Sequence, residues 1–225
     1  MSKSFIECIS LNKQYNGKKQ PINAITDINL QVECGEFILL KGRSGAGKST
    51  LLNLIGGLIR PTSGSVRIED NIISRLDNNT LSALLLNQIG IIFQSLNLLP
   101  TYDVYENIEI ALAPKGLGRK EIQKLVLPYF DQFQLTDKLH LLPEELSVGQ
   151  QQKVAIIRTL VKQPSIILAD EPTASVDDET ANEILGYLRN LNDKKNVTII
   201  VATHGAISET IADRILLMEN GYIKN

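Results

Sequence analysis

The sequence is poor in the residues that mark disulfide-rich secreted proteins. Its 225 residues contain only two cysteines, Cys8 and Cys34, which do not form a C-x-x-C pair. Two separate thiols are too few for a disulfide scaffold, so we expect reduced cysteines with a packing role in a cytosolic environment. The first seven residues also lack the apolar core of a signal peptide.

A basic excess and a long apolar run are absent as well. Lys and Arg number 23 against 25 Asp and Glu, and the net charge is −2. We therefore expect no nucleic-acid partner. The uncharged segment 78–102 is interrupted by asparagines, glutamines, a glycine and a proline. It lacks the ~20 mainly apolar residues of a spanning helix, so any association with a membrane requires a partner chain.

The apolar pattern predicts strands that alternate with helices. The expected strands are 22–34, 36–41, 65–68, 89–93, 166–169, 197–202 and 214–218, and the expected helices are 48–58, 121–133, 149–162 and 180–192. Such alternation favours an α/β fold with a mostly parallel sheet that is covered on both faces. We expect one domain, 1–225, in which a helical lobe (about 96–160) is inserted into a core (about 1–95 and 161–225).

The segment Gly42–Ser49 (GRSGAGKS) matches the phosphate-binding pattern G-x-x-x-x-G-K-[ST]. Its glycines allow backbone N–H groups to face an anion, and the helix that follows adds its positive end. Lys48 supplies a charge to the phosphates, and the Ser49 hydroxyl is a suitable ligand for Mg²⁺. An expected strand before the loop and an expected helix after it make nucleotide binding the favoured interpretation over a chance glycine-rich turn.

Two acidic residues follow the apolar run 165–169. A buried strand that delivers a carboxylate to a phosphate loop is a common way to hold Mg²⁺, and Asp170 is placed for this role. Glu171 is one residue further, where it can polarise a water for in-line attack. Two idle, solvated acids at a strand end are the alternative, which the phosphate loop makes the weaker one.

The segment Leu146–Gln150 (LSVGQ) precedes an expected helix. Ser147 and Gln150 have the spacing of a capping box. A capped helix start is also an anion site, so structural and ligand-binding interpretations share one conformation here.

Together these motifs, in this order, resemble the nucleotide-binding subunit of ATP-binding-cassette (ABC) transporters over about 6–222. Segments 93–100 (FQSLNLLP) and 168–173 (LADEPT) resemble the branch of lipoprotein-releasing, macrolide-export and cell-division ATPases. The resemblance implies a P-loop NTPase core of the RecA type with an antiparallel β edge and an inserted helical lobe. It also implies ATP and Mg²⁺ as cofactors.

The resemblance assigns roles residue by residue. Tyr15 is placed like the aromatic residue that stacks on adenine. Gln94 is placed like the residue that senses Mg²⁺ and the attacking water. Asp177 is placed like a residue of the loop that communicates across the dimer. The implied catalytic residues are Glu171 as general base, His204 as switch histidine, Gln94 and Lys48. The implied metal-site residues are Ser49, Gln94 and Asp170. The implied nucleotide contacts are Tyr15, Gly42, Ser44, Gly45, Ala46, Gly47, Lys48, Ser49, Thr50 and, toward the nucleotide of a second subunit, Ser147, Gly149 and Gln150.

Three residues depart from the family pattern. Val148 replaces a glycine in the signature segment, Lys153 replaces an arginine, and Gly205 replaces an aspartate beside the switch histidine. A β-branched side chain restricts the backbone, and lysine loses the planar fork of arginine. We therefore expect slower hydrolysis than is usual for the family.

The resemblance implies an ATPase that forms a homodimer with ATP and energises a separate integral membrane permease, at the cytoplasmic face of the membrane, in an export or lipoprotein/macrolide-type system. A mechanical or regulatory ATPase of the cell-division type, which moves no solute, is the alternative. A soluble ATPase of DNA repair or translation is less favoured, because coiled-coil insertions and a second cassette are absent from the sequence.

Overall fold

The structure is a computed structural model, and it describes residues 4–17, 20–205 and 207–224. The strands are β1 (Ile6–Tyr15), β2 (Ile22–Val32), β3 (Phe37–Lys41), β4 (Ser63–Ile68), β5 (Asn71–Ile72), β6 (Ile89–Ile92), β7 (Ile166–Asp170), β8 (Thr198–Thr203), β9 (Arg214–Glu219) and β10 (Tyr222–Lys224). The α-helices are α1 (Lys48–Ile55), α2 (Asn78–Asn87), α3 (Val104–Glu109), α4 (Arg119–Gln132), α5 (Val148–Leu160) and α6 (Asp178–Lys195). Short 3-10 helices lie at Ile73–Arg75, Ile110–Lys115, Thr136–Lys138, Pro143–Glu145 and Glu209–Ile211.

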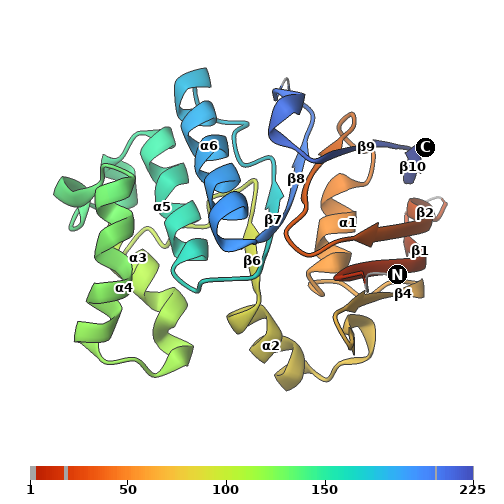
Figure 1. Ribbon diagram of the computed structural model, residues 1–225, viewed down its shortest axis with the longest axis horizontal. Helices are drawn as coiled ribbons and strands as arrows, with labels where there is room; N and C mark the ends of the chain where they lie inside the picture. Colours follow the sequence, from red (N-terminus) through yellow and green to blue (C-terminus); the bar gives the residue numbers. More distant parts are fainter. Residues whose placement is uncertain (1–3, 18–19, 206, 225) are drawn as a thin grey trace.

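Two sheets enclose helix α1 (Figure 1). In the described part of the chain, one sheet has the order β2-β1-β4-β5 and is antiparallel. The other has the order β10-β9-β3-β8-β7-β6, and all its pairings are parallel except that of β10 with β9. Helix α1 contacts β7 and β8 on one side and β2 on the other. The α/β fold with an antiparallel edge, expected from the sequence, is therefore confirmed.

The parallel strands separate two hydrophobic cores, because successive side chains point to opposite faces. In β3, Ile38 and Leu40 face the core around α1, whereas Phe37 and Leu39 face the core under the other helices. All four are fully buried. Strands of this kind carry continuous apolar runs because both faces are covered.

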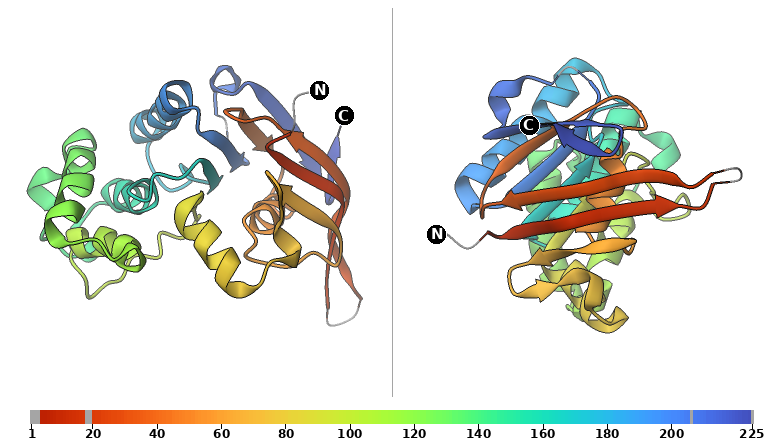
Figure 2. Two further views of the ribbon diagram at one scale, coloured as in Figure 1. Left: turned by 60° about the horizontal axis from the view of Figure 1, so that its bottom comes forward. Right: turned by 90° about the vertical axis from the view of Figure 1, so that its right-hand side faces the viewer.

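Helices α3, α4 and α5 lie on the side of the parallel sheet away from β1 and β2 (Figure 1; Figure 2, left). From Val104 to Leu160 the structure describes helices and turns. Helix α6 covers the same face of the sheet, nearer to β8. Among the described residues, no helix combines the length and hydropathy needed to cross a bilayer.

The two longest elements that were not expected from the sequence are β1 and α2. Strand β1 is missed because its register with β2 shifts between Cys8 and Leu11, where Ser10 has φ 42°, so the alternation of apolar residues breaks. Helix α2 buries only Leu84 and has a weak apolar face.

The prediction that both cysteines pack inside is half wrong. Cys8 is buried, and this burial raises the pKa of its thiol to about 12. Cys34 is exposed, because it follows the end of β2 at the edge of the fold.

Candidate active site

The glycine-rich loop between β3 and α1 has a backbone that most residues cannot adopt. Gly45 has φ 78° and Gly47 has φ 106°, both left-handed. A Cβ atom at Gly47 would lie 2.4 Å from the carbonyl oxygen of Ala24 in β2. Glycine is therefore required at this position by both conformation and space. The loop can turn its N–H groups toward an anion at the start of α1.

Lys48 places a buried charge at this loop. Its side chain is 6% exposed, and its Nζ donates hydrogen bonds to the carbonyl oxygens of Gly42 (2.8 Å) and Arg43 (3.3 Å). The same ammonium lies 3.5 Å from Oε1 of Glu171. A buried ammonium needs such partners, and they fix its position under the loop.

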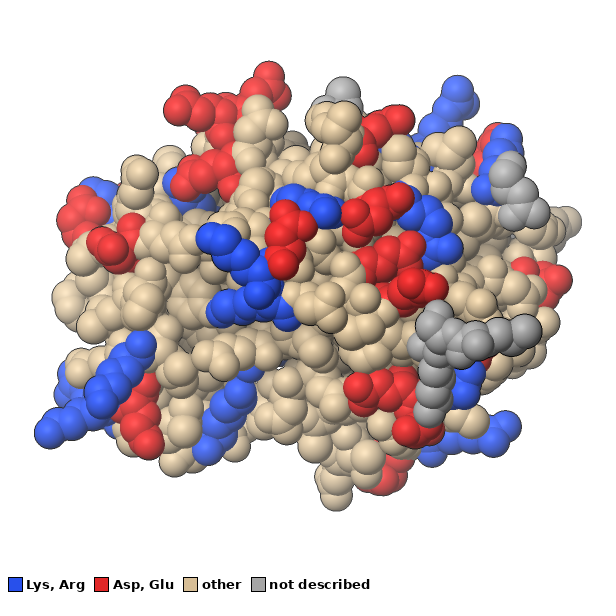
Figure 3. All heavy atoms as spheres, viewed as in Figure 1, with Lys and Arg blue, Asp and Glu red and all other residues tan. Residues whose placement is uncertain are grey.

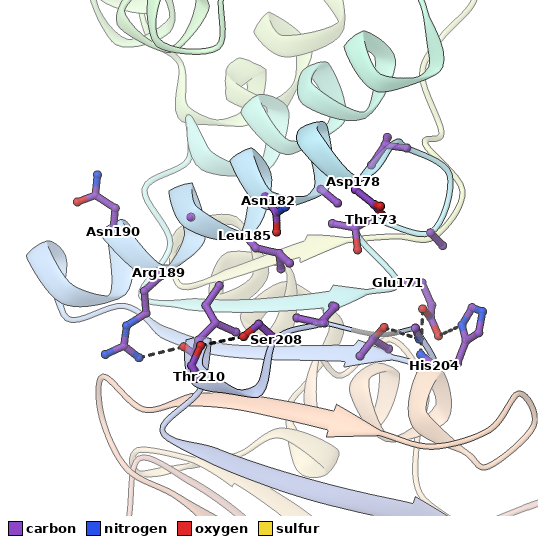
Figure 4. A pocket seen from close by; sticks show the side chains of 18 of the residues that line it. Glu171, Thr173, Asp178, Asn182, Leu185, Arg189, Asn190, His204, Ser208 and Thr210 are labelled. Atoms are coloured by element: carbon purple, nitrogen blue, oxygen red, sulfur yellow. Dashed lines mark hydrogen bonds and ion pairs between the residues drawn. The ribbon is translucent and has the colours of Figure 1, made fainter.

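Glu171 lies where β7 ends, and it turns sharply away from the strand. Its φ is 51°, and its N–H donates to the carbonyl oxygen of Ala202 in β8 (2.9 Å). A left-handed backbone at a residue other than glycine costs roughly 1–3 kcal/mol, and such strain clusters at active sites and ligand clamps. The carboxylate is 8% exposed and lies 2.7 Å from Nδ1 of His204 (Figure 4).

Asp170 has the features of a metal ligand. Burial raises the pKa of its carboxyl group, and a hydrogen bond with Ser49 acts in the opposite direction. Its Oδ1 is buried and has no hydrogen-bond partner among the described residues. A buried oxygen without a partner, next to a serine hydroxyl, fits the oxygen ligands that Mg²⁺ prefers.

A cavity of about 340 Å³ brings most of the predicted residues together. Those that line it are Ser44, Gly45, Ala46, Gly47, Lys48, Ser49, Thr50, Gln94, Glu171 and His204. Gly42 lies beside it, since a Cβ there would be 3.2 Å from that of Ala46. A second, larger cavity of about 930 Å³ shares Glu171 and His204 and continues along α6 (Figure 4).

Three residues of β2 line the same cavity, and the sequence analysis did not assign them to it: Ile22, Asn23 and Ala24. Tyr15 does not line it. Tyr15 is 40% exposed, pairs with Ile22 across the β1–β2 hairpin, and has the Lys13 ammonium 5.1 Å from its ring centroid. The hairpin is the signal that could have identified the β2 residues, because it joins them to a predicted adenine contact.

The signature segment lies apart from this cavity. Ser147 and Gln150 form the predicted capping box of α5: the Gln150 N–H donates to Ser147 Oγ (3.3 Å), and the Ser147 N–H donates to Gln150 Oε1 (3.0 Å). A Cβ at Gly149 would lie 3.4 Å from Thr180 in the first turn of α6. Ser147, Gly149 and Gln150 are therefore placed next to α6 and not at the phosphate loop of the same chain.

Two further predicted residues surround this segment. Asp177 caps α6 by accepting a hydrogen bond from the Thr180 N–H (2.8 Å). This bond and a second one from the Thr180 hydroxyl lower the pKa of the Asp177 carboxyl group. Lys153 of α5 pairs with Glu183 of α6 at 2.7 Å. The ion pair joins α5 to α6, and the cap fixes the start of α6.

Comparison with known proteins decides the family. Residues 25–174 match the family described as ABC transporter. The chain belongs to the ABC transporter family. The ABC transporter ATP-binding protein YtrE from Bacillus subtilis is 38% identical over 92% of this chain and 90% of that protein. The methionine import ATP-binding protein MetN from Coxiella burnetii is 39% identical over 97% of this chain but only 62% of its own length. The chain thus spans about three fifths of the methionine-import relatives.

A solved structure shows the same cassette fold. The dimeric structure of the ABC transporter cassette MJ0796 from Methanocaldococcus jannaschii has a TM-score of 0.93 at 35% identity. The match covers 98% of this chain and 97% of that chain. Another structure of MJ0796 is a dimer in a post-hydrolysis state with ADP and Pi.

Proposed function

We propose that this ABC cassette binds and hydrolyses ATP, dimerises with a second copy of itself when ATP is bound, and energises a separate integral membrane permease from the cytoplasmic face of the membrane. The observation that carries this proposal is the position of Glu171. Its carboxylate lies between the buried Lys48 and His204, at a cavity lined by the phosphate loop.

The residues of this chain divide the chemistry among them. The loop N–H groups and Lys48 bind the β and γ phosphates of ATP and offset their charge. Glu171 accepts the proton of the attacking water as general base. His204 and Gln94, from two different strand ends, position the water and the γ-phosphate. The residues that would hold Mg²⁺ are Ser49, Asp170 and Gln94, and the ion, when bound, supplies positive charge to the phosphates.

A second copy is needed because the signature residues do not reach the cavity of their own chain. Ser147, Gly149 and Gln150 would complete the nucleotide site of the partner chain. Tyr15 would stack on the adenine of the ATP bound to its own chain. ATP would then close the dimer and hydrolysis would reopen it. The lobe of 96–160 would pass this motion to the permease through 96–106.

For the transport system, we favour an export or lipoprotein/macrolide-type complex. The support is the segment 93–100, which resembles that branch. The relatives named for methionine import show that a similar cassette also serves importers. The cargo itself is recognised by the permease.

The test combines hydrolysis with purification of partners. Tagged Glu171→Gln protein, purified with ATP from native membranes in mild detergent, should retain a dimer and carry a polytopic membrane protein in stoichiometric amount. Glu144→Gln, a change at an exposed carboxylate outside the site, is the matched control and should hydrolyse ATP normally. Recovery of only soluble proteins, ribosomes or DNA would contradict the transport role and leave the ATPase chemistry in place.

A further inference from the structure

A groove between α4 and the C-terminal half of α6 is separate from the nucleotide site. Two neighbouring cavities, of about 400 Å³ and about 300 Å³, share Tyr129, Gln163, Leu191 and Lys195. They therefore form one groove, which we call the α4–α6 groove. None of its lining residues lines the cavity at the phosphate loop.

The charge of the groove has one sign. Among the residues that the structure describes, the charged ones that line the two cavities are Lys124, Lys194 and Lys195. All three are exposed, and the structure records no ion pair for them in the described residues. Figure 3 shows several basic side chains near the C-terminal end of α6, with acidic side chains beside them. Neighbouring cations repel one another, and an anion between them relieves that repulsion.

Compensation of the helix dipole explains only part of this cluster. Lys194 and Lys195 lie in the last turn of α6, where cations are favourable. Lys124 lies in the middle of α4, far from the end of that helix, so the dipole gives no reason for its position. Its side chain lines the same cavity as Lys194 and Lys195, so the three ammonium groups border one space.

The lining of the groove mixes apolar side chains with polar ones such as Gln132, Gln163 and Asn190, and its two tyrosines are held in place. The Tyr129 hydroxyl donates to the carbonyl oxygen of Leu160 (3.2 Å), and the Tyr187 ring packs on Phe133 with centroids 4.6 Å apart. The smaller of the two cavities, of about 300 Å³, is also lined by Ile167 and other side chains of the hydrophobic core. Preformed apolar walls with a few polar groups are typical of small-molecule sites of about 300–1,000 Å³.

We propose that the α4–α6 groove binds a small amphiphilic anion, in which an aromatic or aliphatic body carries a carboxylate, sulfonate or phosphate group. The apolar body would lie along Tyr129 and Leu191, and the anionic group would face Lys124, Lys194 and Lys195. Such a ligand would contact α4 on one side and α6 on the other. Binding at this groove is independent of the proposed ATPase function.

The test uses 1-anilinonaphthalene-8-sulfonate, an aromatic anion whose fluorescence rises in apolar surroundings, and N-phenyl-1-naphthylamine, its counterpart without the sulfonate. The intact chain should bind one molecule of the anionic probe, more tightly than the neutral one. Saturating ADP should leave this binding unchanged. Lys195→Gln and Gln163→Glu, which remove or oppose one charge at residues shared by both cavities, should each weaken it by up to about fivefold.

Arg75→Gln is the control, because it removes one exposed positive charge outside the groove and should leave binding unchanged. Thermal unfolding of each variant checks that the fold is intact. Any one of three results would overturn the assignment. These are no binding of the anionic probe up to about 1 mM, displacement by ADP, and equal affinity of both groove variants and the parent.

Discussion

The carboxylate of Glu171 lies 2.7 Å from Nδ1 of His204, although 33 residues separate them in the chain. The two residues follow β7 and β8, which are parallel neighbours in the sheet. Carboxyl ends of parallel strands share one edge of a sheet, which is where open α/β folds place their ligands. Register therefore brings together the proposed general base and the proposed switch histidine, which the sequence identifies one at a time.

Replacing Glu171 by glutamine should abolish hydrolysis and preserve ATP binding. The amide keeps the shape of the side chain but cannot accept a proton, so phosphate release should fall about 10²–10⁴-fold. Equilibrium binding of ATP should stay within a few-fold of the parent. A variant with normal turnover would show that Glu171 is not the general base.

Val148→Gly should increase the rate of hydrolysis. Val148 is the first residue of α5 and is 49% exposed, so its side chain projects from the signature segment without packing in the core. Removing it frees the backbone that would approach the nucleotide of a partner. Steady-state ATPase measurements above the dimerisation concentration test this, and a rate no higher than that of the parent would count against a restrictive role for Val148.

Ser147→Ala should affect both stability and activity. It removes the cap of α5, which should cost about 1 kcal/mol in the free energy of unfolding. Asp77→Ala is the matched control, because it removes the cap of α2. The Asp77 side chain accepts hydrogen bonds from two backbone N–H groups of that helix. Both variants should lose stability, and only Ser147→Ala should also reduce hydrolysis. Equal activity of the two variants would make Ser147 purely structural.

Tyr15→Ala should weaken ATP binding, whereas Tyr15→Phe should not. Base–aromatic stacking contributes about 1–3 kcal/mol and needs only the ring. We therefore expect the Kd for ATP to increase roughly 5–150-fold in the alanine variant, which is the fold-change that corresponds to this loss of stacking energy. Binding of an ATP analogue with a fluorescent ribose label measures it. An unchanged affinity in Tyr15→Ala would remove Tyr15 from the site.

Acid should destabilise the protein in part through Asp213. Burial acts to raise the pKa of this carboxyl group, but hydrogen bonds from the Phe37 N–H (2.8 Å) and from Arg189 (2.8 Å) outweigh it and lower the pKa below the ordinary value of 3.8. A lowered pKa in the folded state means that the unfolded chain binds the proton first. The stabilising contribution is complete above about pH 3.8 and is lost as the pH falls below it.

Urea unfolding between pH 3 and pH 7 tests this dependence. In Asp213→Asn the free energy of unfolding should decline less steeply in acid than in the parent. An identical acid slope in both proteins would assign the acid sensitivity to other carboxylates.

Short-range features could be predicted from the sequence. The phosphate loop, the capping box of Ser147 and Gln150, and the buried runs of β3, β7 and β8 depend on neighbours within a few residues, and the structure has each of them. Strand β1 could not be predicted, because its shift in register at Ser10 is stabilised by pairing with β2 and β4. That Ile22, Asn23 and Ala24 line the cavity at the phosphate loop could not be predicted either, because it depends on how the antiparallel sheet packs over the parallel one.

The sequence by itself determined which chemical groups this protein has and in what order, since a glycine-rich turn, a cap and a strand-end carboxylate follow from local backbone and side-chain preferences. The tertiary structure alone decided which of these groups meet. It sets Glu171 against His204 and Lys48, leaves the signature segment beside α6 and away from the loop of its own chain, and places Lys124 opposite Lys194 and Lys195. The reason is that strand order and helix packing minimise the exposed apolar surface of the whole chain, and no local segment contains that information.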